Sequence, residues 1–266
     1  MKYSIVFLLA MMILPVQAGG LAWENALSGD NRSADNKARD EYRHPRETLE
    51  FFGLKSGMTV VEIAPGGGWY TEIMAPLLKD NGRVYAAHYS ANGPGGYYRK
   101  SLGTYLQKLG ENNDIYEGVI VTTLQPPGET TIAPAGSADL VVAFRNVHSW
   151  LRAGSAQQTM SAIYTALKPG GVFGVVQHRA KAGTDLESMK KSGYVTERQV
   201  MDIAEAAGFV LAGASEINAN PKDTADHPAG VWTLPPSLRM KEKDRAKYIA
   251  IGESDRMTLK FIKPQS

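Results

Sequence analysis

Short apolar stretches alternate with amphipathic stretches along most of the chain. Between Gly53 and about Ser215, runs typical of buried strands lead through turns into segments whose apolar residues recur every three or four positions, as on one helix face. This pattern predicts strands over residues 58–64, 83–88, 119–122, 139–144, 172–177 and 210–215, and helices over 70–78, 97–109, 156–167 and 196–208. Repeated strand–helix units predict a parallel sheet with helices on both faces. We therefore expect one doubly wound α/β domain.

Two of these helices carry signals for their ends. Thr196 and Gln199 have the spacing of a capping box, and Gly208 is placed to close the same helix. Gly110 is the expected end of the helix over 97–109, whose expected apolar face consists of Tyr98, Leu102, Tyr105, Leu106 and Leu109.

The last predicted strand, residues 256–263, has a different pattern. Met257, Leu259 and Phe261 alternate with Thr258 and Lys260. Such alternation is typical of an antiparallel strand with one face exposed, rather than of a parallel strand buried on both faces.

The composition excludes several classes of protein. The 266 residues are 43% hydrophobic and 21% charged with a net charge of +2, which is ordinary for a globular domain and unlike a collagen-like or disordered chain. Because there is no Cys, thiol catalysis, cysteine metal sites and disulfides are excluded. No long basic run is present, so nothing indicates a nucleic-acid partner, and the oligomeric state stays open.

Residues 1–18 have the pattern of a secretory signal peptide. Lys2 precedes an apolar run from Ile5 to Leu14, and the small residues Val16 and Ala18 predict cleavage before Gly19. The run is too short for the roughly 20 residues that span a bilayer, although an uncleaved anchor is the alternative. We expect a periplasmic or secreted protein with no stable membrane insertion after cleavage.

A glycine-rich turn follows the first predicted strand. The strand ends near Glu62, the glycines Gly66 to Gly68 follow, and the helix begins at Tyr70. Such a turn at the carboxyl edge of a sheet is typical of nucleotide-like ligand sites, although glycines also serve as simple connections. Thr71 stands where a dinucleotide fingerprint needs Gly, and no Gly-Lys-Ser/Thr triplet is present. NAD and ATP sites are therefore disfavoured.

The segment Glu62-Ile63-Ala64-Pro65-Gly66-Gly67-Gly68 resembles motif I of the class I S-adenosylmethionine-dependent methyltransferases, with Ala64 replacing the first glycine. Later landmarks follow in the family's order at residues 82–87, 138–144 and 167–171, so the resemblance covers roughly residues 45–263. Residues 37–45 and 178–180 resemble a narrower group of exported methyltransferases. The resemblance implies a Rossmann-like sheet of seven strands, mostly parallel with an antiparallel last strand.

The same resemblance implies S-adenosyl-L-methionine as the cofactor. It assigns the methionine part of the cofactor to Glu62, Ala64, Gly66 and Gly68, with Tyr70 beside them. The alternative for Glu62 is a purely structural partner at the strand end and helix start.

The sequence departs from the family at two cofactor positions. His88 stands where an acidic residue usually holds the ribose, and Thr122 and Thr123 stand where an acid often holds the adenine amino group. His88 could bond a ribose hydroxyl or be a loop residue without a ligand.

Candidate catalytic residues follow the fourth and fifth strands. The resemblance implies that the loop after the fourth strand faces the transferred methyl group and the substrate. There Asn146 offers an amide and His148 is the expected base. His178 and Arg179 end the fifth strand, where Arg179 could clamp a substrate anion, and Tyr194 is a weaker candidate.

Simpler roles are open for the same residues, because packing and ion pairing are common fates of such side chains. His148 could only pack under Trp150, and Arg179 could only pair with Asp185 or Glu187. A metal site is not expected, since the histidines lack the spacing of a ligand motif. The absence of Gly-x-Ser-x-Gly disfavours a serine hydrolase.

The chain after the signal peptide divides into four segments. We expect a polar N-terminal arm over 19–52, in which Tyr42 and Arg43 fold over the cofactor, and a core over 53–216. Residues 217–254 are predicted to form a partly ordered cap in which Trp232 contacts the domain, because compact domains seldom hold so long an insertion in one hairpin. The last strand lies within 255–266.

These features favour methyl transfer from S-adenosylmethionine to a small-molecule acceptor in the periplasm. Two alternatives stay open. One is a ligand-binding protein that keeps the fold without catalysis, and the other is an enzyme that uses adenosylmethionine for different chemistry.

Overall fold

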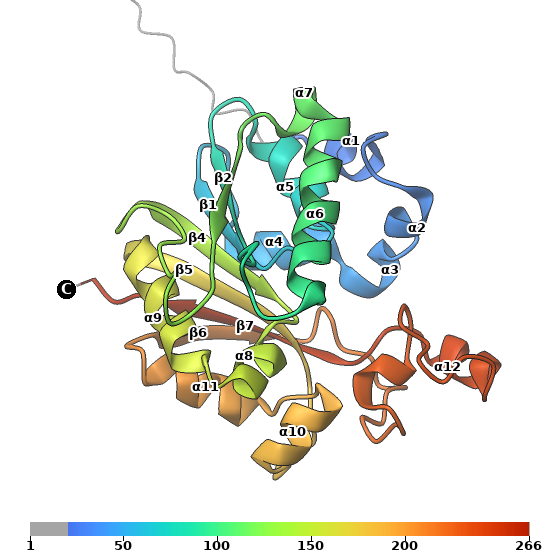
Figure 1. Ribbon diagram of the computed structural model, residues 1–266. Coiled ribbons are helices and arrows are strands. Elements are labelled where there is room, and N and C mark those ends of the chain that lie inside the picture. The colour runs from blue at the N-terminus through green and yellow to red at the C-terminus, as the bar shows by residue number, and fades with distance from the viewer. Residues whose placement is uncertain (1–20, 266) are drawn as a thin grey trace, which may run out of the picture.

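A single seven-stranded sheet forms the centre of the computed structural model, which describes residues 21–265 (Figure 1). Its order is β3-β2-β1-β4-β5-β7-β6, with β7 antiparallel to both of its neighbours. The strands are β1 (Thr59–Ile63), β2 (Arg83–His88), β3 (Val119–Thr123), β4 (Ala138–Phe144), β5 (Leu167–His178), β6 (Val210–Ser215) and β7 (Arg256–Ile262). The predicted doubly wound, mostly parallel sheet with an antiparallel last strand is confirmed. The predicted signal peptide, residues 1–18, lies outside the described residues.

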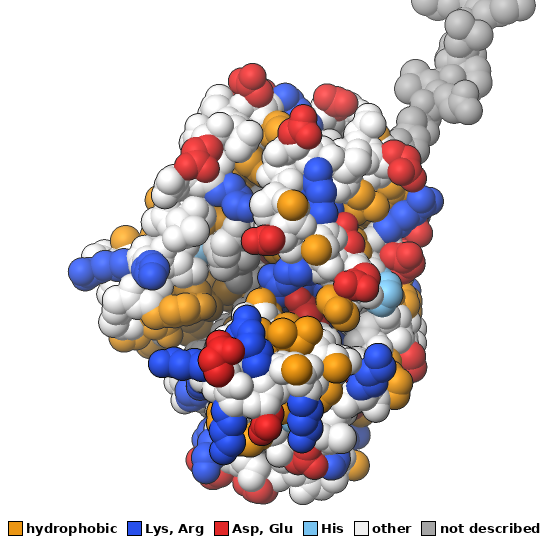
Figure 2. Space-filling model, turned by 90° about the vertical axis from the view of Figure 1, so that its right-hand side faces the viewer, with side chains coloured by type: hydrophobic (Ala, Val, Ile, Leu, Met, Phe, Trp, Pro, Cys, Tyr) orange, Lys and Arg blue, Asp and Glu red, His pale blue; other side chains and the backbone are white. Residues whose placement is uncertain are grey.

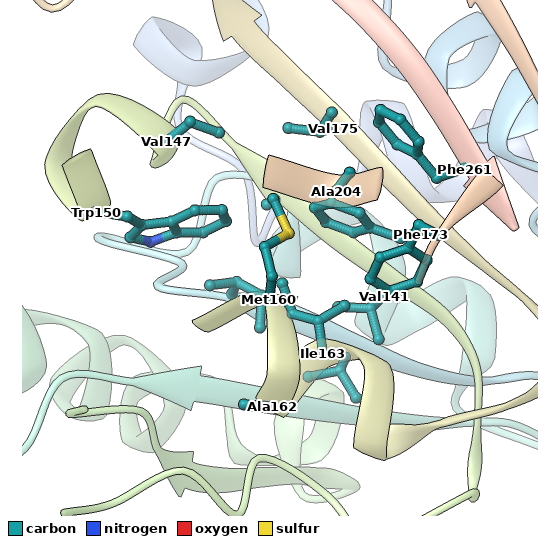
Figure 3. Close-up of a cluster of buried hydrophobic side chains, with 14 of the residues drawn as sticks. Val141, Val147, Trp150, Met160, Ala162, Ile163, Phe173, Val175, Ala204 and Phe261 are labelled. Carbon is teal, nitrogen blue, oxygen red and sulfur yellow. The ribbon is translucent and has the colours of Figure 1, made fainter. Parts of the chain in front are cut away.

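One face of the sheet packs against three helices, α8 (Val147–Ala153), α9 (Ala156–Ala166) and α11 (Glu197–Glu205). Figure 3 shows this core, in which Met160 and Ile163 of α9 and Ala204 of α11 lie over Val141 and Phe173 of the sheet. All five side chains are fully buried. The two strand residues reach this face because side chains along a strand point alternately to its two faces.

The other face is covered by α1 (Trp23–Ser28), α4 (Pro45–Phe52) and α5 (Thr71–Leu78). Phe52 of α4 and Ile73 of α5 pack on Val60 and Val142, the strand residues of opposite parity. The remaining helices are α2 (Ala34–Lys37), α3 (Asp40–Arg43), α6 (Gly96–Glu111), α7 (Asn113–Tyr116), α10 (Leu186–Ser192), α12 (Arg245–Ile251) and the 3₁₀ turn η1 (Gly230–Thr233).

Some element boundaries differ from the prediction. Helix α6 continues through Gly110 to Glu111, and of its expected apolar face only Tyr105 is buried. Strand β5 begins at Leu167 rather than 172, because Leu167 already pairs with Ala138 before a register shift leads to the pair of Leu140 and Val172. The Thr196 cap of α11 is confirmed, since its side chain accepts a hydrogen bond from the backbone N–H of Gln199 at 3.2 Å. The helix ends at Glu205, however, and not at Gly208 as predicted.

The expectation that one face of β7 is exposed is wrong. The strand lies between β5 and β6, and its Thr258 side chain is 0% exposed. Helix α4 covers the polar face, where the side-chain amide of Asn218 donates to the hydroxyls of both Thr258 and Thr48. The alternating polar residues therefore serve a contact with the N-terminal arm rather than with water.

The N-terminal arm and the insertion over 217–254 meet at one side of the sheet's carboxyl edge. The arm is less polar than expected, because Trp23 and Ala26 of α1 join the core. Ordered parts of the insertion include η1 and α12, with Leu234 and Tyr248 buried. Among residues 21–265, no helix combines the length and apolar character needed to cross a membrane.

Candidate active site

The glycine-rich turn opens onto a cavity at the carboxyl end of β1. Ala64 and Gly66 both have positive φ angles, 43° and 61°, so the chain turns sharply before α5 begins. A Cβ added at Gly66 or Gly67 would meet no heavy atom within 4 Å. The backbone of these two residues is therefore accessible to a ligand, which is what a glycine loop provides.

This cavity has a volume of about 380 Å³. Its walls come from the glycine turn, the end of β4, the N-terminal arm and the insertion. The lining side chains that matter for its chemistry are Asn36, Arg39, Arg43, Glu62, Tyr70, Arg145, Asn146, His148 and Trp232. The structure thus brings together Glu62, Ala64, Gly66, Tyr70, Asn146 and His148 from the predicted site.

Glu62 lies at the base of the cavity and is only 2% exposed. Its carboxylate accepts a hydrogen bond of 2.6 Å from the Thr71 hydroxyl, which also lies 3.2 Å from the hydroxyl of Tyr105. Burial raises the pKa of Glu62 to about 7, so the carboxyl group changes between its protonated and ionised forms near neutral pH.

Two aromatic residues join the turn to its surroundings. Tyr70 stacks on Phe144 at the end of β4, with ring centroids 3.4 Å apart. The Trp69 indole N–H donates to the carbonyl oxygen of Asn36, and the Arg43 guanidinium lies over the indole at 4.6 Å. The arm is therefore fastened across the glycine turn, and Arg43 lines the cavity as the sequence predicts. Tyr42 lies outside it, against Gly252.

Gly68 has a different role from the one predicted. A Cβ at Gly68 would lie 3.0 Å from the Tyr105 ring and 3.2 Å from the Lys108 side chain, both on α6. Its φ of 80° and this close helix packing, rather than ligand contact, require glycine here.

His88 is not available to a ribose, because both of its ring nitrogens are bonded within the protein. Nδ1 accepts from the backbone N–H of Tyr89 at 2.7 Å, which leaves the proton on Nε2, and Nε2 donates to the carbonyl oxygen of Gly66 at 3.1 Å. The side chain is 0% exposed, and burial lowers its pKa. His88 fixes the glycine turn instead of lining the cavity.

A second hollow of about 310 Å³ adjoins the first and shares Ala64, Tyr89, Tyr97 and Ser149 with it. Thr123, the predicted adenine contact, lines neither. Gln125, two residues further along, lines the second hollow, and its buried Oε1 has no hydrogen-bond partner among the described residues. Sequence comparison with the family pattern misses Gln125, because it lies beyond the end of β3.

Asn146 and His148 lie where the sequence predicts, after β4. The Asn146 amide donates to the carbonyl oxygen of Ile63 at 2.7 Å and so joins β4 to β1. His148 is 8% exposed, lines the cavity and lies beside Trp232, with ring centroids 5.8 Å apart.

The hydrogen bonds of Gln177 determine the proton position on His148. Gln177 Oε1 accepts from the backbone N–H of Val147 at 3.1 Å, so its amide nitrogen donates, at 3.3 Å, to Nδ1 of His148. The proton of the neutral ring is then on Nε2. Burial and nearby Arg152 lower the pKa of His148 to about 4. At neutral pH this residue offers an N–H donor rather than the expected base.

His178 and Arg179 do not line the cavity. His178 lies behind His148, with ring centroids 5.8 Å apart, and its Nδ1 is 2.5 Å from the Ser254 hydroxyl. The Arg179 guanidinium pairs with Asp255, Glu197 and Glu216, so ion pairing is its role, although Asp185 and Glu187 are not the partners.

Tyr194, the weaker catalytic candidate, is engaged away from the cavity. The Tyr194 hydroxyl donates to the buried carboxylate of Asp223 at 2.9 Å and lies outside the cavity. Within residues 21–265, no three His, Asp or Glu side chains are grouped so as to hold a metal ion.

The arginines of the cavity are functional candidates that sequence reasoning missed, apart from Arg43. Arg39 and Arg43 are four residues apart on the arm, and Arg145 directly follows β4 with a left-handed φ of 65°. That position, between the strand end and Asn146, was the available signal for Arg145.

No protein-family model and no curated protein sequence matches the chain. Solved structures do match it. A SAM-dependent methyltransferase from Aquifex aeolicus is 17% identical, with 85% of this chain and 93% of that chain covered and a TM-score of 0.57. Geranyl diphosphate C-methyltransferase from Streptomyces coelicolor A3(2) is 12% identical, with 90% and 87% covered and a TM-score of 0.56.

The [4+2]-cyclase SpnF is also similar, at 18% identity, with 93% of this chain and 88% of that chain covered and a TM-score of 0.61. At such identities these likenesses concern the fold alone, and the cyclase is a reminder that a fold does not determine the reaction. The chain has the Rossmann-like fold of S-adenosylmethionine-dependent methyltransferases.

Proposed function

We propose that this protein binds S-adenosylmethionine in the two adjoining hollows and transfers its methyl group to a small-molecule acceptor. The observation that carries this proposal is the open backbone of Gly66 and Gly67, which lines the same hollow as the buried carboxyl group of Glu62. The adjoining hollow is lined by Gln125, whose Oε1 has no hydrogen-bond partner among the described residues. These groups suit the two polar ends of the cofactor, its amino group and its adenine amino group.

The remaining lining residues fit the middle of the same ligand. Tyr89 and Ser149 line both hollows, and the space they share is where a ribose would join the two ends. Because His88 is already bonded to Gly66, the ribose hydroxyls would be held by groups other than His88.

The bound cofactor supplies a methyl group already activated by a sulfonium, so the protein's task is mainly to position the acceptor. His148 offers an N–H to orient an acceptor oxygen or nitrogen, and Trp232 closes the cavity beside it. Since His148 is neutral and donates a hydrogen bond, an acceptor whose nucleophilic atom needs no removal of a proton before it reacts is favoured.

A substitution at Gly67 tests the ligand site. Gly67 has no positive φ and open space around its Cβ direction, so Gly67→Val should fold while its side chain enters the cavity. Gly118→Val is the matched control, because Gly118 has equally open space and lies outside both hollows. We expect calorimetry to show saturable binding of S-adenosylhomocysteine to the wild type and Gly118→Val, and at least tenfold weaker binding to Gly67→Val. Equal affinity in all three proteins would contradict the proposal.

A binding protein without methyl transfer is a second candidate, favoured by the bonded state of His88 and the donor state of His148. Incubation with adenosylmethionine carrying a labelled methyl group, together with a set of small acceptors, separates the two. Appearance of label in an acceptor supports methyl transfer, whereas tight cofactor binding without any labelled product supports the second candidate.

We also propose that the protein acts outside the cytoplasm after cleavage behind Ala18. This rests on the pattern of residues 1–18. N-terminal sequencing of the protein recovered from the periplasmic fraction should begin at Gly19, and recovery of the uncleaved chain in the cytosol would contradict it.

A further inference from the structure

Three arginines contact one carboxylate next to the cavity, and a fourth, Arg145, lines the same cavity as two of them. Glu253 accepts from Nε of Arg39 at 2.6 Å, from Nε of Arg43 at 3.2 Å, and from Arg256. Burial lowers the pKa of Arg43 well below its ordinary value, and the positive charge of Arg145 lowers it further. A single carboxylate cannot balance four guanidinium groups, so this region carries excess positive charge.

Donor groups in this cluster lack partners. Among the described residues, the buried Nη2 atoms of Arg39 and Arg43 have no hydrogen-bond partner. Arg43 is only 3% exposed, yet both residues line the cavity. A buried guanidinium nitrogen without a partner is costly, so these atoms indicate a group that the protein lacks on its own.

Arg145 is the third lining arginine and has no carboxylate of its own. Its guanidinium makes no hydrogen bond or ion pair within the described chain, and its backbone is held in the left-handed region. Burial and the charge of Arg256 lower its pKa to about 10. Arg145 is therefore a charged side chain, at neutral pH, placed at the cavity without a counter-ion.

The cofactor cannot supply the missing negative charge. S-adenosylmethionine has one carboxylate, but it also carries an ammonium and a sulfonium group, so its net charge at neutral pH is positive. Among residues 21–265, Glu62 is the only acidic side chain lining the cavity, and its pKa of about 7 leaves it partly neutral. A second, anionic ligand is needed for balance.

We propose that the methyl acceptor is an anionic small molecule, whose carboxylate or phosphate group is bound by Arg145 together with Nη2 of Arg39 and Arg43. This inference rests on the proposed function and adds the chemical class of the acceptor. Guanidinium groups bind both kinds of anion through paired N–H donors, which gives orientation as well as affinity.

The positive charge belongs to the cavity rather than to a broad basic surface. On the face seen in Figure 2, Lys and Arg side chains are interspersed with Asp and Glu, and the net charge of the whole chain is only +2. A small ligand that enters the cavity fits this arrangement better than a polyanion lying on the surface.

The test is calorimetry on the mature protein saturated with S-adenosylhomocysteine, using inorganic phosphate and malonate as separate probes and chloride of equal ionic strength as the reference. Three proteins are compared: the wild type, Arg145→Met and Arg198→Met. Arg198 is an exposed arginine on α11 outside the cavity, so it controls for loss of one positive charge. We expect saturable binding of at least one probe, weakened at least tenfold by Arg145→Met and less than twofold by Arg198→Met. The probe that binds identifies the class of anion.

Cofactor affinity distinguishes the acceptor site from a site for the cofactor's own carboxylate. S-adenosylhomocysteine should bind wild type and Arg145→Met within twofold. If Arg145→Met weakens S-adenosylhomocysteine tenfold but leaves methylthioadenosine, which lacks the carboxylate, unchanged, Arg145 serves the cofactor and the inference is overturned. It is also overturned if neither probe binds the loaded wild type. Failure of S-adenosylhomocysteine itself to bind would instead refute the proposed function, and anion binding that depends on Arg145 would then still support the anion site.

Discussion

The imidazole of His88 donates from Nε2 to the carbonyl oxygen of Gly66, 3.1 Å away, and thereby connects the end of β2 to the glycine turn. The family pattern places a ribose-binding acid at this position, yet here the side chain faces the protein's own backbone. The turn is thus held in its open shape by a side chain rather than by a ligand.

Replacing His88 by Asp should therefore damage the fold rather than improve cofactor binding. The carboxylate would face the Gly66 carbonyl oxygen in a fully buried site, which costs roughly 3 kcal/mol. His88→Gln retains an amide donor and should cost less than about half of that. Urea denaturation measures both. A stable His88→Asp protein with tighter S-adenosylhomocysteine binding would mean that His88 faces the ligand after all.

The buried carboxyl group of Glu62 should make stability depend on pH. Its pKa of about 7 in the folded state exceeds its ordinary value of 4.5, so its contribution to stability is present at low pH and is lost as the pH rises through 7. Glu62→Gln can still accept from Thr71 and should be more stable than the wild type at pH 8 by about 2–3 kcal/mol.

By pH 5 most of this difference should disappear, because the wild-type carboxyl group is then protonated in the folded state. Denaturation of both proteins at the two pH values checks the sign. The same substitution should weaken cofactor binding if Glu62 holds the amino group. A difference in stability that grows as the pH falls would contradict this account of Glu62.

Glu253 should contribute strongly to stability, because three arginines share its carboxylate. Glu253→Gln leaves Arg39, Arg43 and Arg256 without their shared counter-ion and should cost about 3–5 kcal/mol. Glu216→Gln is a matched control, because it removes an exposed partner of Arg179 and should cost less than about 1 kcal/mol. The arm should also be cut faster by protease in Glu253→Gln. Similar stability of the two variants would show that the cluster is not organised by Glu253.

Gly68→Ala should lower stability without removing the ligand site. The new methyl group would meet Tyr105 at 3.0 Å, and a left-handed φ of 80° costs a non-glycine residue about 1–2 kcal/mol. S-adenosylhomocysteine affinity of the folded fraction should stay within a few-fold of wild type. A stable variant that no longer binds would place Gly68 at the ligand instead.

The layout of the fold follows from local patterns, and for that reason most of it is predictable. Apolar strands that alternate with amphipathic helices specify the parallel sheet, and the Thr196 cap is determined by residues three apart. The exposure of β7 is not predictable in this way, because the residues covering Thr258 come from the arm and from Asn218.

Backbone position alone brings part of the predicted site to one cavity. Glu62 lies near the end of β1, Ala64 and Gly66 follow that strand, Asn146 follows β4, and all four line the cavity. The roles of His88 and Arg179 depend instead on partners distant in sequence, such as Gly66 and Asp255, and strand-end position does not reveal them. Gln125 and Arg145 are not recognisable as candidates from the sequence. Only the structure shows that, among the described residues, the Gln125 Oε1 atom and the Arg145 guanidinium lack hydrogen-bond partners.

A crystal structure of the protein with S-adenosylhomocysteine tests the central claim most directly. The account predicts the amino acid part of the ligand over Gly66 and Gly67, near Glu62, and the adenine amino group within hydrogen-bond distance of Gln125 Oε1. It also predicts that His88 still bonds to Gly66. A complex with the ligand elsewhere, or crystals that show an empty cavity at saturating S-adenosylhomocysteine, would contradict it.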